Sequence, residues 1–147
     1  MSKIKTVLFS GKTHTTVTVP PASATDHGLV AIHMSAADGS DIVLEAAAPH
    51  PTAEQLFAGA WSACYTTAVG LVAQQMKVKL PSDLSVGIEV DLGQSGAEWL
   101  LQARMNVRLP GLDQATAEKI AHTAHEICPY SKATRGNIDV ALNVFVS

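Results

Sequence analysis

Arginine is scarce in this sequence of 147 residues: there are only three, and the first stands at position 104. Charged residues make up 16% and aromatic residues 5%, with a net charge of −3. The lack of any basic stripe excludes the usual footprint of a nucleic-acid-binding surface, and there is no polybasic membrane anchor. Hydrophobic residues at 47% are enough for a core. Together with the length, they predict a single folded domain spanning residues 1–147.

The N-terminus lacks the long apolar region and the cleavage site of a signal peptide. Its first nine residues hold two lysines and a very short apolar run. We therefore expect a cytoplasmic location. In that compartment two cysteines are normally reduced, and a disulfide is more often catalytic than structural.

Residues 55–76 form an uncharged stretch of 22 residues, long enough to raise the question of a membrane span. Seven polar side chains within it argue against a lone lipid-spanning helix: Gln55, Ser62, Tyr65, Thr66, Thr67, Gln74 and Gln75. A helix that is apolar nearly all round is also found at the buried centre of a soluble assembly. One chain of this length can hardly cover such a helix alone, so we expect a homodimer.

The hydrophobic pattern predicts strands, a helix, strands, a helix and a final strand. Alternating or β-branched runs indicate strands at 4–9, 14–19, 28–34, 42–44, 84–92, 98–109 and 138–146. A helix with an apolar stripe begins after Thr52 as cap, and a second begins after Asp113 as cap. Residues 93–96 are expected to turn the chain between two strands, and 128–137 to form a compact turn before the last one. This order predicts an α+β fold.

Two cysteines are the candidates for chemistry. Cys64 lies on the apolar stripe of the first helix, and Cys128 lies at the end of the second, before Pro129. Both could be small buried hydrophobes, a common fate for free cysteine. A reactive thiol needs a nearby cation, a hydrogen-bond donor or a helix N-terminus, and spacing alone supplies none of these for Cys64. Both interpretations stay open at this point.

Glu54 is the only acidic residue of the first helix. It either favours the positive end of the helix dipole or belongs to a thiol site. Ten helical residues span about 15 Å, so Glu54 cannot touch Cys64 of its own straight helix. If both serve one site, Glu54 comes from a partner subunit.

Signatures of metal, phosphate and dinucleotide sites are absent. His122 and His125 are three apart, but there is no His-Glu-x-x-His pattern and no Cys-x-x-Cys pair. We expect no metal, and interpret the two histidines as part of a solvated or interfacial helix face. Arg135 is expected to have a structural role in the turn at 128–137.

Three segments resemble the organic hydroperoxide resistance proteins of the Ohr/OsmC family. They are PTAEQLFAGAWSAC at 51–64, LPGLD at 109–113, and CPYSKATRGN at 128–137. The two cysteine motifs are 64 residues apart, and their joint occurrence is specific. The resemblance covers about residues 50–147, and it favours a functional role for both cysteines.

The resemblance implies an intertwined α+β homodimer of antiparallel sheets with a central buried helix in each chain. It also implies a thiol-dependent organic hydroperoxide reductase without metal, haem or flavin. Cys64 would attack the peroxide, Glu54 would belong to the same site, and Cys128 would resolve the sulfenic acid to a disulfide. A dithiol reductant, typically a lipoylated protein, would restore both thiols. Apolar neighbours such as Phe57, Trp61 and Tyr130 would favour alkyl or fatty-acid hydroperoxides.

One departure from the family pattern concerns the activation of Cys64. The family has an arginine in a glycine-rich turn near the N-terminus, paired with the glutamate, and this chain has neither that arginine nor the glycines. Lys12 or His14 could supply a cation, although the lysine ammonium is a point charge and lacks the planar set of hydrogen-bond donors of an arginine guanidinium. Arg104 and Arg108 share a strand face and are outside candidates.

Two alternatives to the peroxidase therefore remain. One is a non-catalytic relative that binds an apolar small molecule. The other is a thiol/disulfide redox protein without a peroxide substrate.

Overall fold

The computed structural model describes residues 13–18, 29–35, 40–47 and 52–147, and these fall into two compact units. The first unit runs to Thr52 and the second from Ala53 to Ser147. The strand predicted at 4–9 lies outside the described residues.

The first unit contains a three-stranded antiparallel sheet in the order β1-β2-β3. Its strands are β1 (Thr13–Thr18), β2 (Leu29–Ser35) and β3 (Asp41–Ala47). Thr13 pairs with Met34 and Leu29 with Ala47, so each strand follows its neighbour as in a meander. The strands predicted at 14–19, 28–34 and 42–44 are confirmed within one to three residues at their ends.

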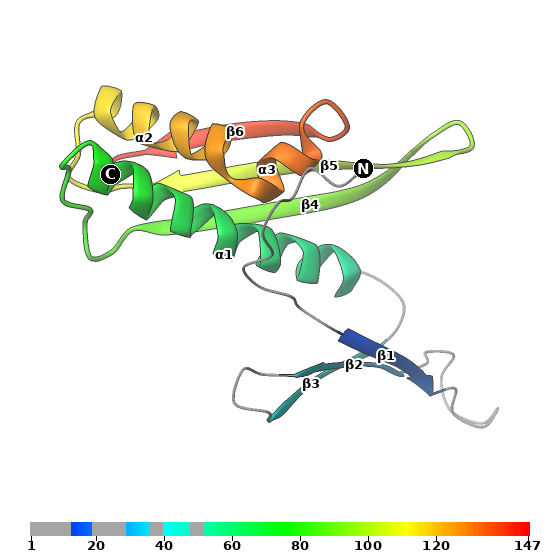
Figure 1. The fold of residues 1–147 in the computed structure, drawn as a ribbon. Helices are drawn as coiled ribbons and strands as arrows, with labels where there is room; N and C mark the ends of the chain where they lie inside the picture. Colours follow the sequence, from blue (N-terminus) through cyan, green and yellow to red (C-terminus); the bar gives the residue numbers. More distant parts are fainter. Residues whose placement is uncertain (1–12, 19–28, 36–39, 48–51) are drawn as a thin grey trace, which may run out of the picture. The chain divides into compact units, whose positions relative to one another are not determined.

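The second unit begins with the long helix α1 (Thr52–Gln75) and continues with the hairpin β4 (Ser85–Ser95) and β5 (Glu98–Arg108). Helices α2 (Gln114–Ile127) and α3 (Pro129–Thr134) then lead to β6 (Asp139–Phe145). The sheet order is β4-β5-β6, with β4 antiparallel and β6 parallel to β5. A parallel pair needs a crossover connection, and α2 with α3 supplies it. The predicted α+β class is confirmed (Figure 1).

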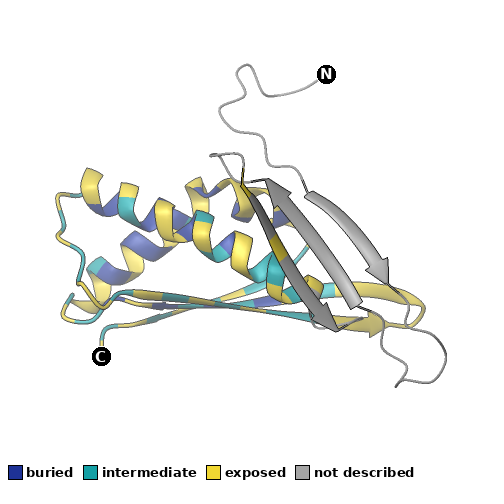
Figure 2. Cartoon of the chain, turned by 90° about the horizontal axis from the view of Figure 1, so that it is seen from below, coloured by how far each residue is buried: buried dark blue, intermediate teal, exposed yellow. Residues whose placement is uncertain are grey.

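Both long helices cover the same face of this sheet, as Figure 2 shows. The buried faces of α1, α2 and β5 form one core. Its fully buried side chains include Trp61, Tyr65, Met105, Leu109 and Ile120. Because side chains alternate along a strand, Ala103, Met105 and Val107 face the helices, and the residues between them face away.

Three details of the predicted elements are wrong. The turn at 93–96 is shorter, because β4 continues to Ser95 and only Gly96 and Ala97 separate it from Glu98. Gly96 has φ 62°, which suits the first position of a two-residue hairpin turn. The segment after Cys128 is a short helix, α3, rather than an irregular turn. The helical spacing also predicts Ala60 and Leu71 on the apolar stripe of the first helix and Ile127 on that of the second, but all three are exposed.

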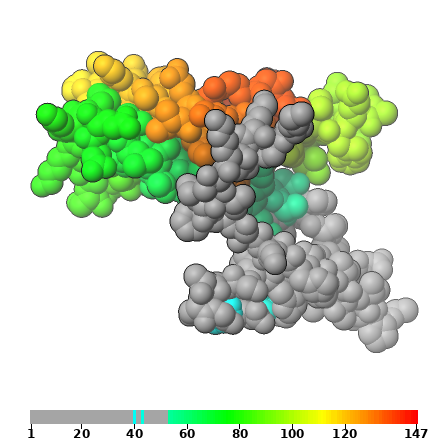
Figure 3. All heavy atoms as spheres, in the orientation of Figure 1, coloured from blue at the N-terminus to red at the C-terminus, as the bar shows by residue number. Residues whose placement is uncertain are grey.

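Helix α1 is long and apolar enough to cross a membrane by length and composition, with a mean hydropathy of 1.4. Only 33% of its most apolar 18 residues are buried within the chain. One of its faces packs on the β4-β5-β6 sheet, which is how the core helix of a globular protein behaves. Away from this core, the tip of the β4–β5 hairpin protrudes as a separate yellow-green lobe in Figure 3, and it carries the exposed side chains of Leu92, Trp99 and Leu100.

Candidate active site

The two cysteines meet inside the second unit. The Cys128 thiol donates a hydrogen bond to the Cys64 sulfur, and the two Sγ atoms are 3.4 Å apart. Both cysteines are free. Cys128 is fully buried, whereas Cys64 is partly exposed. A reagent from solvent therefore reaches Cys64 first, and Cys128 stands behind it.

Local sequence explains why the sulfurs converge. Cys64 lies in α1 on the face that also carries Trp61 and Ala68, three residues before and four after it. Cys128 ends α2 and precedes Pro129, the first residue of α3. A residue before proline is disfavoured in the helical region, and Cys128 adopts φ −58° and ψ 124°. The chain bends there, and the bend is where the thiol meets α1.

Burial, one backbone donor and the neighbouring Cys128 thiol set the protonation of Cys64, and Cys128 acts with burial to raise the pKa. Burial raises the pKa of the Cys64 thiol, and the backbone N–H of Tyr130 acts in the opposite direction. Among the described residues, no cationic side chain is found that shifts the Cys64 pKa. Lys12 and His14, the cations suggested by the sequence, are respectively outside the described residues and on a strand whose side chains are not described.

Two long-range hydrogen bonds flank the cysteine pair. The indole Nε1 of Trp61 donates to Ser131 Oγ at 3.0 Å, and the Tyr65 hydroxyl donates to the Ala121 carbonyl at 2.7 Å. All four residues are buried. Burial also raises the pKa of Tyr65, so its hydroxyl stays a donor. Trp61 and Ser131 each lie three residues from a cysteine, but nothing in the sequence indicated that they bond to each other.

Trp61, one of the three apolar neighbours that would favour alkyl hydroperoxides, is a core residue. Trp61 has no exposed surface, and its ring packs against Phe57 with centroids 5.7 Å apart. Trp61 can be fully buried because its one polar atom, the indole Nε1, is hydrogen-bonded to Ser131. Phe57 is partly buried and Tyr130 is 42% exposed, so those two remain accessible.

Glu54 stands in the first turn of α1, and Cys64 belongs to the same continuous helix. The helical rise therefore separates them by about 15 Å along the axis. Within one chain the structure does not bring Glu54 to the thiols. Its role in the site stays a prediction that requires a partner subunit.

Arg104 and Arg108 are not at the thiols. They lie between the core-facing residues of β5, and so on the sheet face opposite the helices. Arg104 forms ion pairs there with Glu89, at 2.9 Å, and with Asp91. Hydrogen bonds from Arg104 and then from Gln102 lower the pKa of Asp91 to about 2. Arg108 Nε donates to the Ser147 carbonyl at 2.7 Å.

His122 and His125 lie on α2, and Arg135 contacts that helix. Arg135 Nη2 donates to the His125 carbonyl at 3.0 Å, which confirms its expected structural role. His122 is exposed, while Nδ1 of His125 is buried without a hydrogen-bond partner. Across the described part of the chain, no three metal-ligating side chains are grouped.

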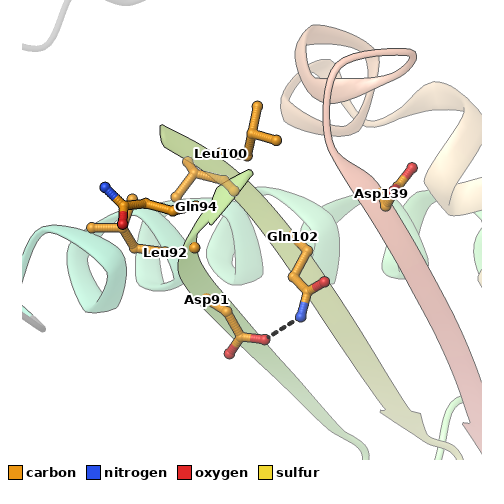
Figure 4. A pocket seen from close by; sticks show the side chains of 8 residues that line it. Asp91, Leu92, Gln94, Leu100, Gln102 and Asp139 are labelled. Atoms are coloured by element: carbon orange, nitrogen blue, oxygen red, sulfur yellow. Dashed lines mark hydrogen bonds between the residues drawn. The ribbon is translucent and has the colours of Figure 1, made fainter. Parts of the chain in front are cut away.

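An open hollow of about 290 Å³ lies near the hairpin end of the sheet (Figure 4). Asp91 and Gln102, which are hydrogen-bonded at 2.8 Å, line it together with Leu92, Gln94, Leu100 and Asp139. Neither cysteine lines this hollow. The candidate chemistry therefore rests on the cysteine pair.

Comparison with known sequences finds a family match over most of the second unit and the end of the first. Residues 45–143 match the sequence model of the OsmC-like proteins. An organic hydroperoxide resistance protein of Xanthomonas axonopodis pv. citri is 42% identical over 91 residues, which are 62% of this chain. The match spans 64% of that relative's own length. Organic hydroperoxide resistance protein OhrB of Bacillus subtilis is 33% identical over 130 residues, which cover 84% of this chain and 96% of that protein.

Comparison with solved structures agrees. The crystal structure of Bacillus subtilis OhrB superimposes with a TM-score of 0.70 at 29% identity. The superposition covers 94% of this chain and 99% of that one. The similarity therefore extends to the strands of the first unit, which the family match only touches.

Proposed function

Because the chain belongs to the OsmC-like protein family, we propose that it is a thiol-dependent organic hydroperoxide reductase. The main support for this function is the pair of cysteines, because the sulfur of the partly exposed Cys64 lies 3.4 Å from the sulfur of the buried Cys128. This arrangement supports a two-cysteine cycle, because the accessible sulfur can react first and the buried one can close a disulfide behind it.

The first step oxidises Cys64. Its thiolate attacks the outer oxygen of an organic hydroperoxide, the O–O bond breaks, and the alkoxide leaves as an alcohol after taking a proton. Cys64 becomes a sulfenic acid. The Tyr130 backbone N–H favours the thiolate, and burial of Cys64 opposes it, so the rate of this step rises with pH.

The second step forms the disulfide. The Cys128 sulfur attacks the Cys64 sulfur, the S–O bond breaks, and the hydroxide leaves as water with the Cys128 proton. The sulfurs must close from 3.4 Å to about 2.05 Å, the length of a disulfide bond. A dithiol then attacks the Cys64 sulfur and releases Cys128 as a thiol. Its second thiol attacks the mixed disulfide, which releases Cys64 and leaves the reductant as a disulfide. A lipoylated protein is the reductant that fits this exchange.

The proposal includes a cytoplasmic homodimer. Dimerisation gives the exposed apolar face of α1 a partner, and it is the only route by which Glu54 can join a thiol site. A second subunit could also bring a cation to Cys64, which the described residues of one chain do not supply.

The test mixes fully reduced protein with one equivalent of cumene hydroperoxide, and separately with hydrogen peroxide, while free thiols and cumyl alcohol are measured. We expect two thiols lost for each alcohol formed, faster with the organic peroxide, and no alcohol from Cys64→Ser. The Cys128→Ser variant should form one alcohol and stop at a sulfenic acid. Reaction with disulfides but not with peroxides would instead identify a thiol/disulfide redox protein. Thiols that survive both treatments would leave the small-molecule-binding alternative.

A further inference from the structure

The hydrogen bond between Trp61 and Ser131 ties α1 to the short helix α3. Its length is 3.0 Å, and both side chains have no exposed surface. Each partner lies one helical turn from a reacting sulfur: Trp61 precedes Cys64 by three residues, and Ser131 follows Cys128 by three. Trp61 shares a helix face with Cys64, and Ser131 lies in the first turn of the helix that Cys128 caps, so the bond runs beside the sulfur pair.

Helix α3 carries two groups that meet Cys64. Cys128 is its cap residue and places its thiol 3.4 Å from the Cys64 sulfur. Tyr130, in its first turn, directs its backbone N–H to the same sulfur. A six-residue helix is too short to be stable alone in water, so its position depends on its attachments. The Trp61–Ser131 bond is an attachment to the helix that carries Cys64.

We propose that Trp61 and Ser131 are positioning residues for disulfide formation. Their bond holds α3 against α1, so that the Cys128 sulfur stays within attacking distance of oxidised Cys64. Neither residue touches the peroxide, because both are fully buried. The inference rests on the proposed function for the sulfenic acid step, but the positioning of the two sulfurs can be measured without any peroxide.

The expected effect follows from geometry. Reacting atoms held about 3–3.5 Å apart are near the attack position, and a displacement of about 1 Å can slow a step roughly 100-fold. Ser131→Ala removes the acceptor and lets α3 shift relative to α1. We expect disulfide formation after peroxide to slow at least tenfold, with more sulfenic acid captured by dimedone. In a Cys128→Ser background, Ser131→Ala should slow alcohol release less than it slows disulfide formation, because only the Tyr130 N–H of α3 acts on the first step.

Four further variants separate positioning from general loosening. Trp61→Phe removes the donor and keeps the ring, and should slow the same step. The double variant should be no slower than the slower single one, because both remove one bond. Ser131→Thr keeps the hydroxyl and should recover most of the rate. Thr134→Val is the matched control: Thr134 is a buried hydroxyl of α3 whose bond, to the Ser131 carbonyl at 3.1 Å, stays within the helix.

The peroxide-free readout is the dithiol/disulfide equilibrium in a dithiothreitol redox buffer. A tenfold lower tendency of the sulfurs to pair raises the reduction potential by about 30 mV. Such a rise in Ser131→Ala and Trp61→Phe would support the positioning role. If the wild-type protein at the same time did not react with peroxide, the positioning role would stand and the peroxidase function would be rejected. Three outcomes would each overturn the inference. The reduction potentials and rates could be unchanged, Thr134→Val could have the same effect as Ser131→Ala, or the effects of the two single substitutions could be independent in the double variant. If Ser131→Ala does not fold by circular dichroism, Trp61→Phe carries the same measurements.

Discussion

Cys64 combines partial exposure with a pKa raised by burial, and this makes its reactivity depend on pH. We expect the Cys128→Ser variant, which retains Cys64 alone, to react with iodoacetamide at a rate that rises into the alkaline range. The half-maximal rate should fall at a higher pH than for N-acetylcysteine, because burial disfavours the thiolate. Labelling rates measured by mass spectrometry from pH 6 to pH 10 provide the check.

A half-maximal rate that is reached at a lower pH than for N-acetylcysteine would contradict this expectation. It would mean that a cation reaches Cys64 from residues or subunits that the described chain does not include. Lys12→Met and His14→Gln would then identify which side chain supplies it, since either one should restore the alkaline profile if it is the source.

His125 predicts a second pH effect, on stability. Burial lowers the pKa of His125, the positive charges of Arg135 and His122 act in the same direction, and Glu126 acts against them. The unfolded chain therefore binds a proton more readily than the folded one, and stability falls as pH drops from about 6.5 toward the folded-state pKa. Above about 6.5 the contribution is fully present.

His125→Gln should remove part of this loss. Urea unfolding at pH 7.5 and pH 5.5 should show a smaller difference in unfolding free energy than in the wild type. His122→Gln should reduce the difference less than His125→Gln does, because the His122 charge is only one of the causes that disfavour protonated His125. An equal or larger loss of stability at pH 5.5 in His125→Gln would rule out His125 as the titrating group.

The cysteines themselves could be found from sequence, but their neighbours could not. The motif around each cysteine identified the pair, and the helix pattern placed Cys64 on α1 correctly. The bond from Trp61 to Ser131 joins residues 70 apart, and no local pattern specifies a contact at that separation. The full burial of Trp61 could not be predicted either, because the sequence does not distinguish an aromatic side chain in a pocket from one in a core.

At the scale of elements, helices and strands followed from periodicity, and errors arose where periodicity is uninformative. The N-cap at Asp113 was predicted and is confirmed, because its carboxylate accepts from the Thr116 N–H at 2.9 Å. The stripe on α1 was partly wrong because the helix is apolar nearly all round, so its sequence does not say which face meets the sheet. Helix α3 was missed because its six residues are fewer than two turns.

The β4–β5 hairpin offers a clean test of backbone conformation. Gly96 has φ 62° in the turn, while Gly93 lies within β4, and a Cβ at either position would have nothing within 4 Å. Gly96→Ala should lower the unfolding free energy by about 1 kcal/mol, because alanine resists positive φ. Gly93→Ala, which meets no such restriction, should leave it unchanged or slightly raised. Urea unfolding of the two variants decides, and equal effects would contradict a backbone origin.

At the scale of the whole molecule, the sheet divides the second unit into an apolar and a polar side. Arg104, Glu89 and Asp91 lie on the polar side, and both long helices lie on the other. Within one chain, Arg104 and Arg108 therefore lie on the sheet face opposite the helix that carries Cys64. Sequence placed them correctly on one strand face, but only the burial of Ala103, Met105 and Val107 reveals which face meets the helices.

The exposed side of α1 carries the last prediction. Leu71 is 49% exposed on a helix that lacks charge over most of its length, and the proposed homodimer would bury it. Leu71→Glu should therefore convert a dimer to a monomer, because a carboxylate in an apolar interface loses its hydration without a partner. Light scattering after size exclusion measures the mass directly. Leu100→Glu is the matched control, since Leu100 is also 49% exposed but stands near the tip of the hairpin.

The same two variants report on the thiol site. If a partner subunit supplies Glu54 or a cation to Cys64, then monomeric Leu71→Glu should lose peroxide reduction at the first step, and Leu100→Glu should not. Disulfide formation in the redox buffer should persist in both, because Cys64 and Cys128 meet within one chain. A wild-type chain that is monomeric at micromolar concentration, or a Leu71→Glu monomer with undiminished peroxide reduction, would show that one chain makes the whole site.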